Sequence, residues 1–267
     1  HGLSGIDGES GVEGPQGIPG VTGPTGDAVV RNIPASNVVT MLDSPGSVGW
    51  YTSSTIGADG LGLISYWYQH QTDGNLKVAH CSDTACTSVY KSTIDSTGSV
   101  GASTSITIGA DGLGLISYYD LTNEALKVAH CSNAACTSAT ISTLDSDGDV
   151  GDHTSITIGA DGLGLISYYD DTNKNLKVAH CSDTACTSAT TSTLDSDGNV
   201  GQTTSITIGA DGLGLISYRD ATDNDLGFAY DLKVAHCSNA ACTSATTSTL
   251  DSDGDVGEHT SITIGAD

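Results

Sequence analysis

The chain has 267 residues and a formal net charge of −24 at pH 7, because 32 acidic side chains face only 8 basic ones. Such a charge repels nucleic acids and anionic membrane surfaces, so neither is an expected partner. Apolar residues make up 37% of the chain, aromatic residues only 5%, and Gly occurs 34 times. This composition argues against one large helical core and favours many short strands and turns.

Residues 2–26 carry a Gly at every third position. Three polyproline II chains wound around one axis need this spacing, because only Gly fits at the axis. A flexible Gly-rich linker is the alternative, although a linker needs no strict period. The triplets Gly-Val-Thr and Gly-Pro-Thr resemble those of collagen-like bacterial and viral surface proteins. The resemblance implies a collagen-like stalk over residues 1–26 and a homotrimer assembled through it.

Residues 27–51 are expected to form a linker with one strand, over Val38–Asp43. Residues 52–267 then repeat with a period of about 50, and the sequence Ile-Gly-Ala-Asp-Gly-Leu-Gly-Leu-Ile-Ser-Tyr returns in each full unit. This period is typical of architectures in which each unit is one supersecondary module. The units begin at about residues 52, 104, 154, 204 and 260.

Each unit divides into strand-like segments separated by turn sequences, and no helical period is visible. In the second unit these segments are 105–111, 113–120, 126–132 and 138–146. We therefore predict an all-β fold of tandem four-stranded repeats, propeller-like blades, four of them complete and a fifth split. A β-solenoid or a string of small β-sandwiches is the alternative fold.

The recurring pattern Leu-Ile-Ser-Tyr-Tyr-Asp followed by Leu-Lys-Val-Ala-His resembles the roughly 50-residue propeller repeats of bacterial extracellular proteins. The resemblance implies a propeller and a location on a cell or virion surface, and it transfers no catalytic residue.

The split fifth unit follows from two leftover segments. Val38–Asp43 matches the fourth strand of a unit, and Thr260–Asp267 matches the first strand of another. These strands are not neighbours in a four-stranded blade. Either further residues beyond Asp267 or a second subunit would fill the gap. Open strand edges favour assembly by strand addition, which predicts a filament.

All eight cysteines occur in pairs separated by four residues, across the loop between the third and fourth strands. The ends of a hairpin come close enough there for a disulfide. A His precedes each pair (His80, His130, His180, His236), but adjacent residues on a strand point to opposite faces, which argues against zinc. We predict four disulfides and an extracellular setting. The pairs are Cys81/Cys86, Cys131/Cys136, Cys181/Cys186 and Cys237/Cys242.

The expected role of these bridges is local. A loop this short gains little stability from a cross-link, so the bridges should brace the loops rather than hold the fold together.

Three acidic loops place oxygen side chains at alternate positions around a turn, as calcium loops do. The pattern lacks a Glu at its far end, and a solvated Asp-Gly turn explains it equally well. No cofactor is expected to be required, and calcium is the one candidate ion. Its candidate ligands are Asp145, Asp147, Asp149, Asp195, Asp197, Asn199, Asp251, Asp253 and Asp255.

Catalysis is not expected from this sequence. A catalytic set would have to break the repeat, and the glutamates are few: Glu9, Glu13, Glu124 and Glu258. The two arginines, Arg31 and Arg219, cannot form a cluster, and no Gly-X-Ser-X-Gly motif occurs. Repeated aromatic pairs could instead stack on sugars, although packing between blades is the simpler role. The candidate ligand or partner contacts are Trp67, Tyr119, Tyr169, Arg219 and Phe228.

These observations predict a non-enzymatic extracellular fibre protein, a subunit of a surface filament or a virion fibre. The alternative is a multivalent carbohydrate-binding propeller head on a trimeric stalk, with surface glycans as partners.

Overall fold

The computed structural model describes residues 39–44, 46–70, 73–222 and 230–265. The chain divides into two units, His1–Val39 and Thr40–Asp267, and all described residues except Val39 belong to the second. The predicted collagen-like stalk and Phe228 lie outside the described residues. Within the described residues, no helix is long and apolar enough to cross a membrane.

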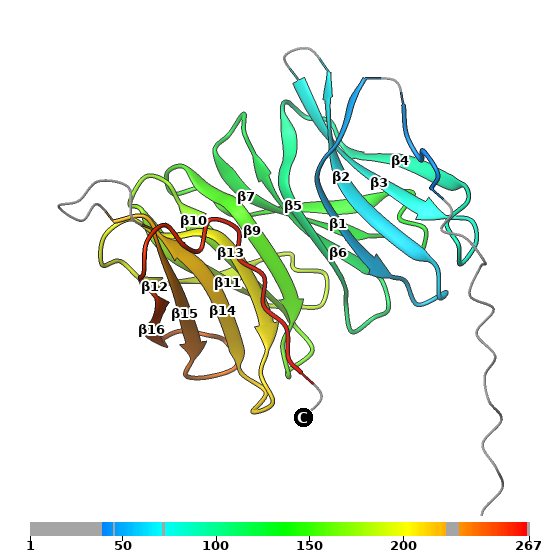
Figure 1. Ribbon diagram of the computed structural model, residues 1–267. Coiled ribbons are helices and arrows are strands. Elements are labelled where there is room, and N and C mark those ends of the chain that lie inside the picture. Colours follow the sequence, from blue (N-terminus) through cyan, green and yellow to red (C-terminus); the bar gives the residue numbers. More distant parts are fainter. Residues whose placement is uncertain (1–38, 45, 71–72, 223–229, 266–267) are drawn as a thin grey trace, which may run out of the picture. The chain divides into compact units, whose positions relative to one another are not determined.

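Residues 47–251 form four antiparallel sheets of four strands each, in simple chain order (Figure 1). Blade one consists of β1 (Ser47–Ile56), β2 (Gly62–His70), β3 (Asp73–Cys81) and β4 (Val89–Asp95). Blade two consists of β5 (Val100–Ile108), β6 (Gly114–Asp120), β7 (Ala125–Cys131) and β8 (Ala139–Asp145). Blade three consists of β9 (Val150–Ile158), β10 (Gly164–Asp170), β11 (Asn175–Cys181) and β12 (Ala189–Asp195). Blade four consists of β13 (Val200–Ile208), β14 (Gly214–Asp220), β15 (Asp231–Cys237) and β16 (Ala245–Asp251).

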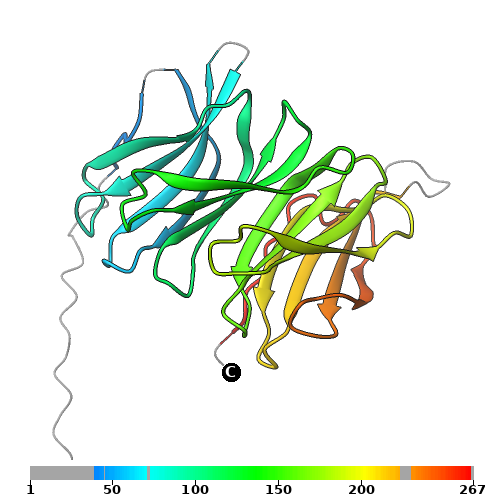
Figure 2. The same cartoon turned by 180° about the vertical axis from the view of Figure 1, so that it is seen from behind.

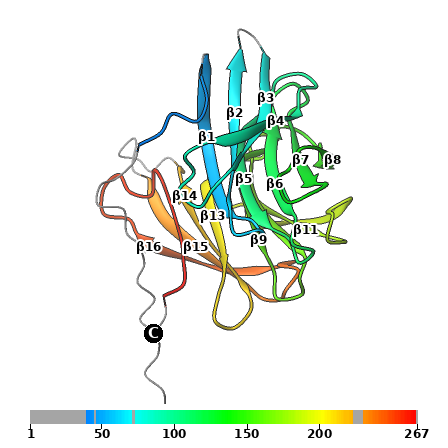
Figure 3. The ribbon, with the colours of Figure 1, turned by 90° about the vertical axis from the view of Figure 1, so that its right-hand side faces the viewer.

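The four first strands are the inner strands of the fold. β1 contacts β5, β5 contacts β9, and β9 contacts β13, while the fourth strand of each blade lies at the outside (Figures 2 and 3). This arrangement confirms the all-β prediction of tandem four-stranded repeats in a propeller-like fold.

Successive blades are joined by apolar cores built from alternating strand residues. Leu115, Leu126 and Val128 of blade two are fully buried against Ile166 and Tyr168 of blade three. Leu115 and Ile166 occupy opposite faces of their sheets, because neighbouring strand residues point to opposite sides. Each full blade therefore turns a leucine-rich face towards the following blade and an isoleucine-tyrosine face towards the preceding one.

A buried polar cluster reinforces each blade boundary. At the second boundary, Asp145 at the end of β8 accepts hydrogen bonds from the Tyr168 hydroxyl and the Lys177 ammonium, both at 2.6 Å. Burial alone would raise the pKa of the Asp145 carboxyl, but these donors and the Asp147 N–H outweigh it and lower the pKa. Asp95 and Asp195 form the same cluster at the other two boundaries.

The first strand of each full blade extends further than predicted. In blade two it begins at Val100 rather than at Ser105, and it includes residues assigned from the sequence to a turn. A bulge explains the difference: the pairing register shifts between Ala102 and Ser105, and Ser103 has a φ of 50°. Bulges re-aim side chains at the ends of strands.

Candidate functional site

A cavity of about 330 Å³ lies where the inner segments meet. Two consecutive residues from each of five segments line it, and the second of the two is always Thr. The segments are β1, β5, β9, β13 and the stretch before Ser261. The cavity falls in the size range of small-molecule sites. Its lining residues are Tyr51, Thr52, Ser103, Thr104, His153, Thr154, Thr203, Thr204, His259 and Thr260.

The two residues before each of these threonines form what we call the rim pairs. The sequence around them, Val-Gly before and Thr-Ser after (Thr52-Ser53 in blade one), is the same in every unit, but the pairs themselves all differ. The five rim pairs are Trp50-Tyr51, Ala102-Ser103, Asp152-His153, Gln202-Thr203 and Glu258-His259. A site that needs one copy of each group breaks a repeat in this way.

The bulge determines how the rim pairs are presented. The second residue of four rim pairs has a φ value near 50°, in a backbone region that residues other than Gly rarely adopt. These residues are Tyr51, Ser103, His153 and Thr203. Such strain is typical of functional sites. The preceding Gly has a positive φ as well, and at Gly151 a Cβ would lie 2.6 Å from the Leu126 Cα. The blade behind the rim therefore requires Gly at this position, which keeps the rim pair in place.

Asp152 is the best-anchored charged group of the rim. Its Oδ1 accepts hydrogen bonds from the Ser103 hydroxyl at 2.6 Å and from the His153 N–H at 2.7 Å. Its side chain remains 37% exposed and that of His153 32%, so both are open to a ligand. Burial, and then the negative charge of Asp152, raise the pKa of Tyr51, which therefore keeps its hydroxyl proton at neutral pH.

Blade one gives the rim an aromatic side. Trp50 is 54% exposed and Tyr51 49%, unlike most large apolar residues here. The rings of Tyr51 and Trp67 lie 6.0 Å apart at 48° to one another. Exposed indole and phenol rings beside polar groups are suited to stacking on the apolar face of a sugar.

Of the residues predicted to contact a ligand, the four that the structure describes lie beside the rim. Each pairs across the strand ladder with the first residue of a rim pair: Trp67 with Trp50, Tyr119 with Ala102, Tyr169 with Asp152 and Arg219 with Gln202. Tyr169 itself is only 2% exposed. The Tyr119 and Tyr169 hydroxyls donate to Asp149 at 2.5 Å and to Asn199 at 2.6 Å. These two rings support the rim from behind.

The side chains of the acidic loops accept hydrogen bonds in two places: at the blade boundaries and from the tyrosines behind the rim. Asp145 and Asp195 receive Tyr and Lys donors from the next blade, and Asp149 and Asn199 receive Tyr hydroxyls. In the described part of the chain, no three His, Cys, Asp or Glu side chains gather where they could hold a metal ion. The calcium prediction therefore has no geometric support.

The predicted disulfides all form, with Cα atoms 4.8 or 4.9 Å apart. Four disulfides are typical of a protein in an oxidising compartment. The bridges join Cys81 to Cys86, Cys131 to Cys136, Cys181 to Cys186 and Cys237 to Cys242.

The second cysteine of a bridge does more than the loop bracing expected from the sequence. Cys136, Cys186 and Cys242 are fully buried, and each belongs to the apolar core that joins its blade to the preceding one. Cys86 is only partly buried, because no blade precedes blade one. These three cysteines therefore also take part in packing between blades. Spacing along the chain could not show this, because the covering residues come from another repeat.

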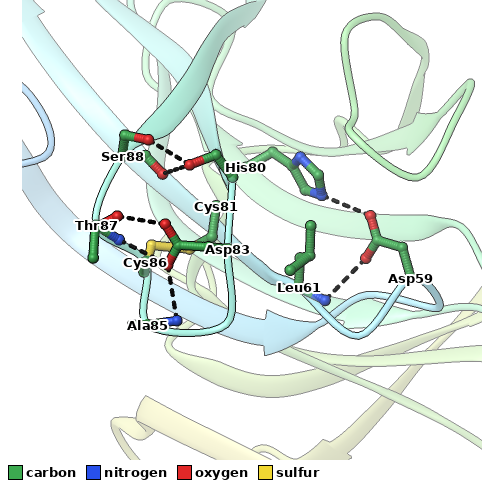
Figure 4. Close-up of a disulfide and its surroundings, with 10 residues drawn as sticks. Asp59, Leu61, His80, Cys81, Asp83, Ala85, Cys86, Thr87 and Ser88 are labelled. Carbon is green, nitrogen blue, oxygen red and sulfur yellow. Dashed lines mark hydrogen bonds and ion pairs between the residues drawn. A yellow bond between two sulfur atoms is a disulfide. The ribbon is translucent and has the colours of Figure 1, made fainter. Parts of the chain in front are cut away.

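Each histidine before a bridge pairs with an aspartate of its own blade. Figure 4 shows Cys81 and Cys86 beside a hydrogen bond of 2.8 Å between the His80 Nε2 and Asp59. His130, His180 and His236 pair in the same way with Asp111, Asp161 and Asp211. The bridges and these pairs lie at the ends of the blades far from the rim pairs.

Comparison with known proteins finds solved structures but no sequence relatives. No family model and no curated protein matches the chain. An α-L-arabinanase of Penicillium chrysogenum, solved with arabinobiose, matches with a TM-score of 0.57 at 12% identity, over 79% of this chain and 70% of its own. A GH62 hydrolase solved with xylotriose gives 0.53 at 12% identity, over 82% and 74%. The GH62 α-L-arabinofuranosidase domain of Coprinopsis cinerea gives 0.52 at 14%, over 79% and 72%.

These similarities establish the fold alone, and they correct the functional prediction. The sequence predicted a non-enzymatic structural and adhesive fibre, whereas the solved structures that share the fold are carbohydrate-active enzymes. The prediction looked for groups that break the repeat and named Glu258 among the glutamates, but it did not consider Asp152. Asp152 lies in β9 and Glu258 in the stretch after β16 that carries no strand, both at a position where the copies diverge. Comparing the copies column by column would have revealed this position.

Proposed function

We propose that this chain is a carbohydrate-active enzyme of an extracellular compartment, which hydrolyses a glycosidic bond at the rim pairs. The observation that carries the proposal is the divergence of the five rim pairs around one cavity in otherwise near-identical repeats. The fold shared with arabinan- and arabinoside-cleaving enzymes supports it.

Asp152 and Glu258 supply the two carboxyl groups that most glycoside hydrolases use. Asp152 is held as a hydrogen-bond acceptor by the Ser103 hydroxyl and the His153 N–H, which suits a base or a nucleophile. Glu258 immediately precedes the cavity residue His259, and we assign it the other role, protonation of the leaving group.

The remaining rim residues bind and orient the sugar. Trp50 and Tyr51 offer an exposed stacking surface. Four of the five cavity threonines donate their hydroxyl protons within the chain, so their oxygens are left to accept hydrogen bonds from sugar hydroxyls. His153 and His259 add two further polar side chains to the lining. The substrate class that we propose is a polysaccharide or oligosaccharide containing arabinose or xylose.

The test is release of reducing sugar from arabinan and arabinoxylan, with the purified chain and two variants. We expect Asp152→Asn and Glu258→Gln each to reduce the rate at least 100-fold, because each removes one partner of a proton-transfer pair. Asp161→Asn, an aspartate at the far end of blade three, is the matched control and should leave the rate unchanged. No release from any of the substrates, or equal rates in all variants, would contradict the proposal.

A further inference from the structure

The two oxygens of the Asp152 carboxylate have different surroundings. Oδ1 accepts two hydrogen bonds, from the Ser103 hydroxyl at 2.6 Å and from the His153 N–H at 2.7 Å. Oδ2 accepts none from the described residues, and the His153 Nε2 lies 3.8 Å from it, too far for a hydrogen bond. One oxygen is therefore held by two donors, and the other keeps its lone pairs.

This difference determines which oxygen of Asp152 can react. A carboxylate oxygen acts as a base or as a nucleophile through a lone pair. A hydrogen bond donated to the oxygen takes up one lone pair and stabilises the charged form, which makes that oxygen less basic. The side chain as a whole is open to a ligand, as its exposure shows. Oδ2 is the oxygen that remains free to meet a substrate.

The side-chain donor to Oδ1 comes from another blade. Ser103 belongs to β5 of blade two and Asp152 to β9 of blade three. In the described part of the chain, this is the only hydrogen bond that joins the side chains of two rim pairs. At the equivalent position of blade four, the Thr203 hydroxyl donates to the Gly257 carbonyl at 3.4 Å instead. The contact with a carboxylate is thus particular to blade two.

Packing between blades fixes both partners of this bond. Ser103 lies in the bulge of β5, and a Cβ on Gly101 before it would lie 2.7 Å from the Leu76 Cα of blade one. The corresponding contact of Gly151 holds the bulge that presents Asp152. The hydroxyl and the carboxylate are each set by a different blade boundary. Their geometry therefore exists before any substrate binds, as a reacting group requires.

Burial suits Ser103 to holding Asp152 rather than to contacting a sugar. Ser103 is only 7% exposed, and Ala102, the other member of its rim pair, is 4% exposed and has no polar side-chain atom. The rim pairs of blades one and three are far more open, as the exposed Tyr51 and the partly exposed His153 show. Blade two therefore enters the site through one buried hydroxyl, and the proton of that hydroxyl is donated to Asp152.

We propose that Ser103 is a positioning residue of the site, which holds Oδ1 of Asp152 and so presents Oδ2 as the reacting oxygen. The inference rests on the proposed function, because it concerns the carboxylate that we assign to the reaction. It goes further by giving blade two a role and by distinguishing the two oxygens of one carboxylate. Without the hydroxyl, the carboxylate loses its anchor in the neighbouring blade, so substrate still binds but reacts more slowly.

The test measures kcat and KM of Ser103→Ala on arabinan or arabinoxylan, whichever the parent chain hydrolyses faster. We expect kcat to fall about tenfold or more with KM nearly unchanged, because the lost donor orients the reacting group and binds no sugar. Ser132→Ala is the matched control, since Ser132 is an exposed serine of the disulfide loop at the far end of blade two. It should leave both constants unchanged.

Two further variants separate the hydroxyl from the shape of the side chain. Ser103→Thr returns a hydroxyl and should restore most of kcat, whereas Ser103→Val has nearly the same shape without a hydroxyl and should be as slow as Ser103→Ala. Thr203 has the same bulge conformation, with a φ of 49°, so the backbone here accommodates a branched side chain. This pair keeps the test decisive even if Ser103→Ala folds poorly.

The outcomes distinguish this inference from the function on which it rests. No hydrolysis by the parent chain would remove the proposed function and this inference with it. Hydrolysis by the parent with an equal kcat in Ser103→Ala would overturn the inference alone. A rise in KM with kcat unchanged would also overturn it, since Ser103 would then bind substrate, and so would equal rates in Ser103→Thr and Ser103→Val.

Discussion

The blade boundaries and the rim pairs show two ways in which one repeat is used. At the boundaries the copies are the same: an Asp, a Tyr and a Lys meet with distances of 2.6 or 2.7 Å in three successive places. At the rim every copy differs, although the flanking Gly and Thr do not. The repeated residues hold the blades together, and the variable ones lie around a single cavity.

Lowering the pH should show the largest difference between the two regions, because protonation acts on the aspartates of all the blade boundaries at once. The folded pKa of Asp43, Asp95, Asp145 and Asp195 is lowered: burial raises it, but the Lys and Tyr donors more than compensate. A lowered pKa adds stability that is complete above the unfolded value of about 3.9 and is lost as the pH falls through the folded value. The melting temperature should therefore hold from pH 7 to 5 and fall steeply below about pH 4.

Base should destabilise the same boundaries through their tyrosines. Burial, and then the nearby aspartates, raise the pKa of Tyr118 and Tyr218 well above the usual range, and the same groups raise that of Tyr168. Stability from a raised pKa is complete below the unfolded value of about 10 and is lost as the pH rises towards the folded one. A melting temperature that does not depend on pH would contradict the role given to these clusters.

Removal of one boundary cation should have the next largest effect. Lys177→Met leaves the buried carboxylates of Asp145 and Asp170 without their cation, and we expect a loss of about 3–5 kcal/mol in the free energy of unfolding. Lys91→Met is the matched control, because Lys91 is 36% exposed and its pair with Asp43 should contribute less than about 1 kcal/mol. Urea unfolding measures both, and similar losses would show that burial of the pair is unimportant.

A disulfide should matter less than a boundary cation. The pair Cys81–Cys86 closes a loop with a sequence separation of only 5, and Cys86 is only partly buried. Short loops gain little from cross-linking, so the double variant Cys81→Ala, Cys86→Ala should lose about 2 kcal/mol and keep its blade structure. Unfolding of the whole propeller on reduction, followed by circular dichroism, would show instead that the bridges hold the fold together.

Local patterns in the sequence predicted the frame, by which we mean the blades and their boundaries, well. The repeated aromatic pairs were expected to pack between blades, as Tyr118 does, and the spacing of Cys131 and Cys136 identified a bridged hairpin loop. Both depend on neighbours along the chain or on the period of a strand. The burial of Cys186 and Cys242 between blades was not predicted, because it depends on residues of the preceding repeat.

The site was missed because it too depends on contacts between blades. The stretch after Asp145 has the composition of a turn, yet Asp152 within it belongs to an inner strand whose bulge is fixed by packing of Gly151 on Leu126. Its meeting with Ser103, 49 residues away in the sequence, is a product of the ring arrangement. No local pattern encodes that contact.

The most direct test of the central claim transplants one rim pair onto another blade. The double variant Asp152→Ala, His153→Ser gives blade three the rim pair of blade two, which the frame already accommodates with the same backbone conformation. Melting temperature and sugar release are measured on the same sample. The account predicts an unfolding free energy within about 1 kcal/mol of the parent and loss of hydrolysis. Full hydrolysis by a stable variant, or collapse of the fold, would contradict the separation of frame and site.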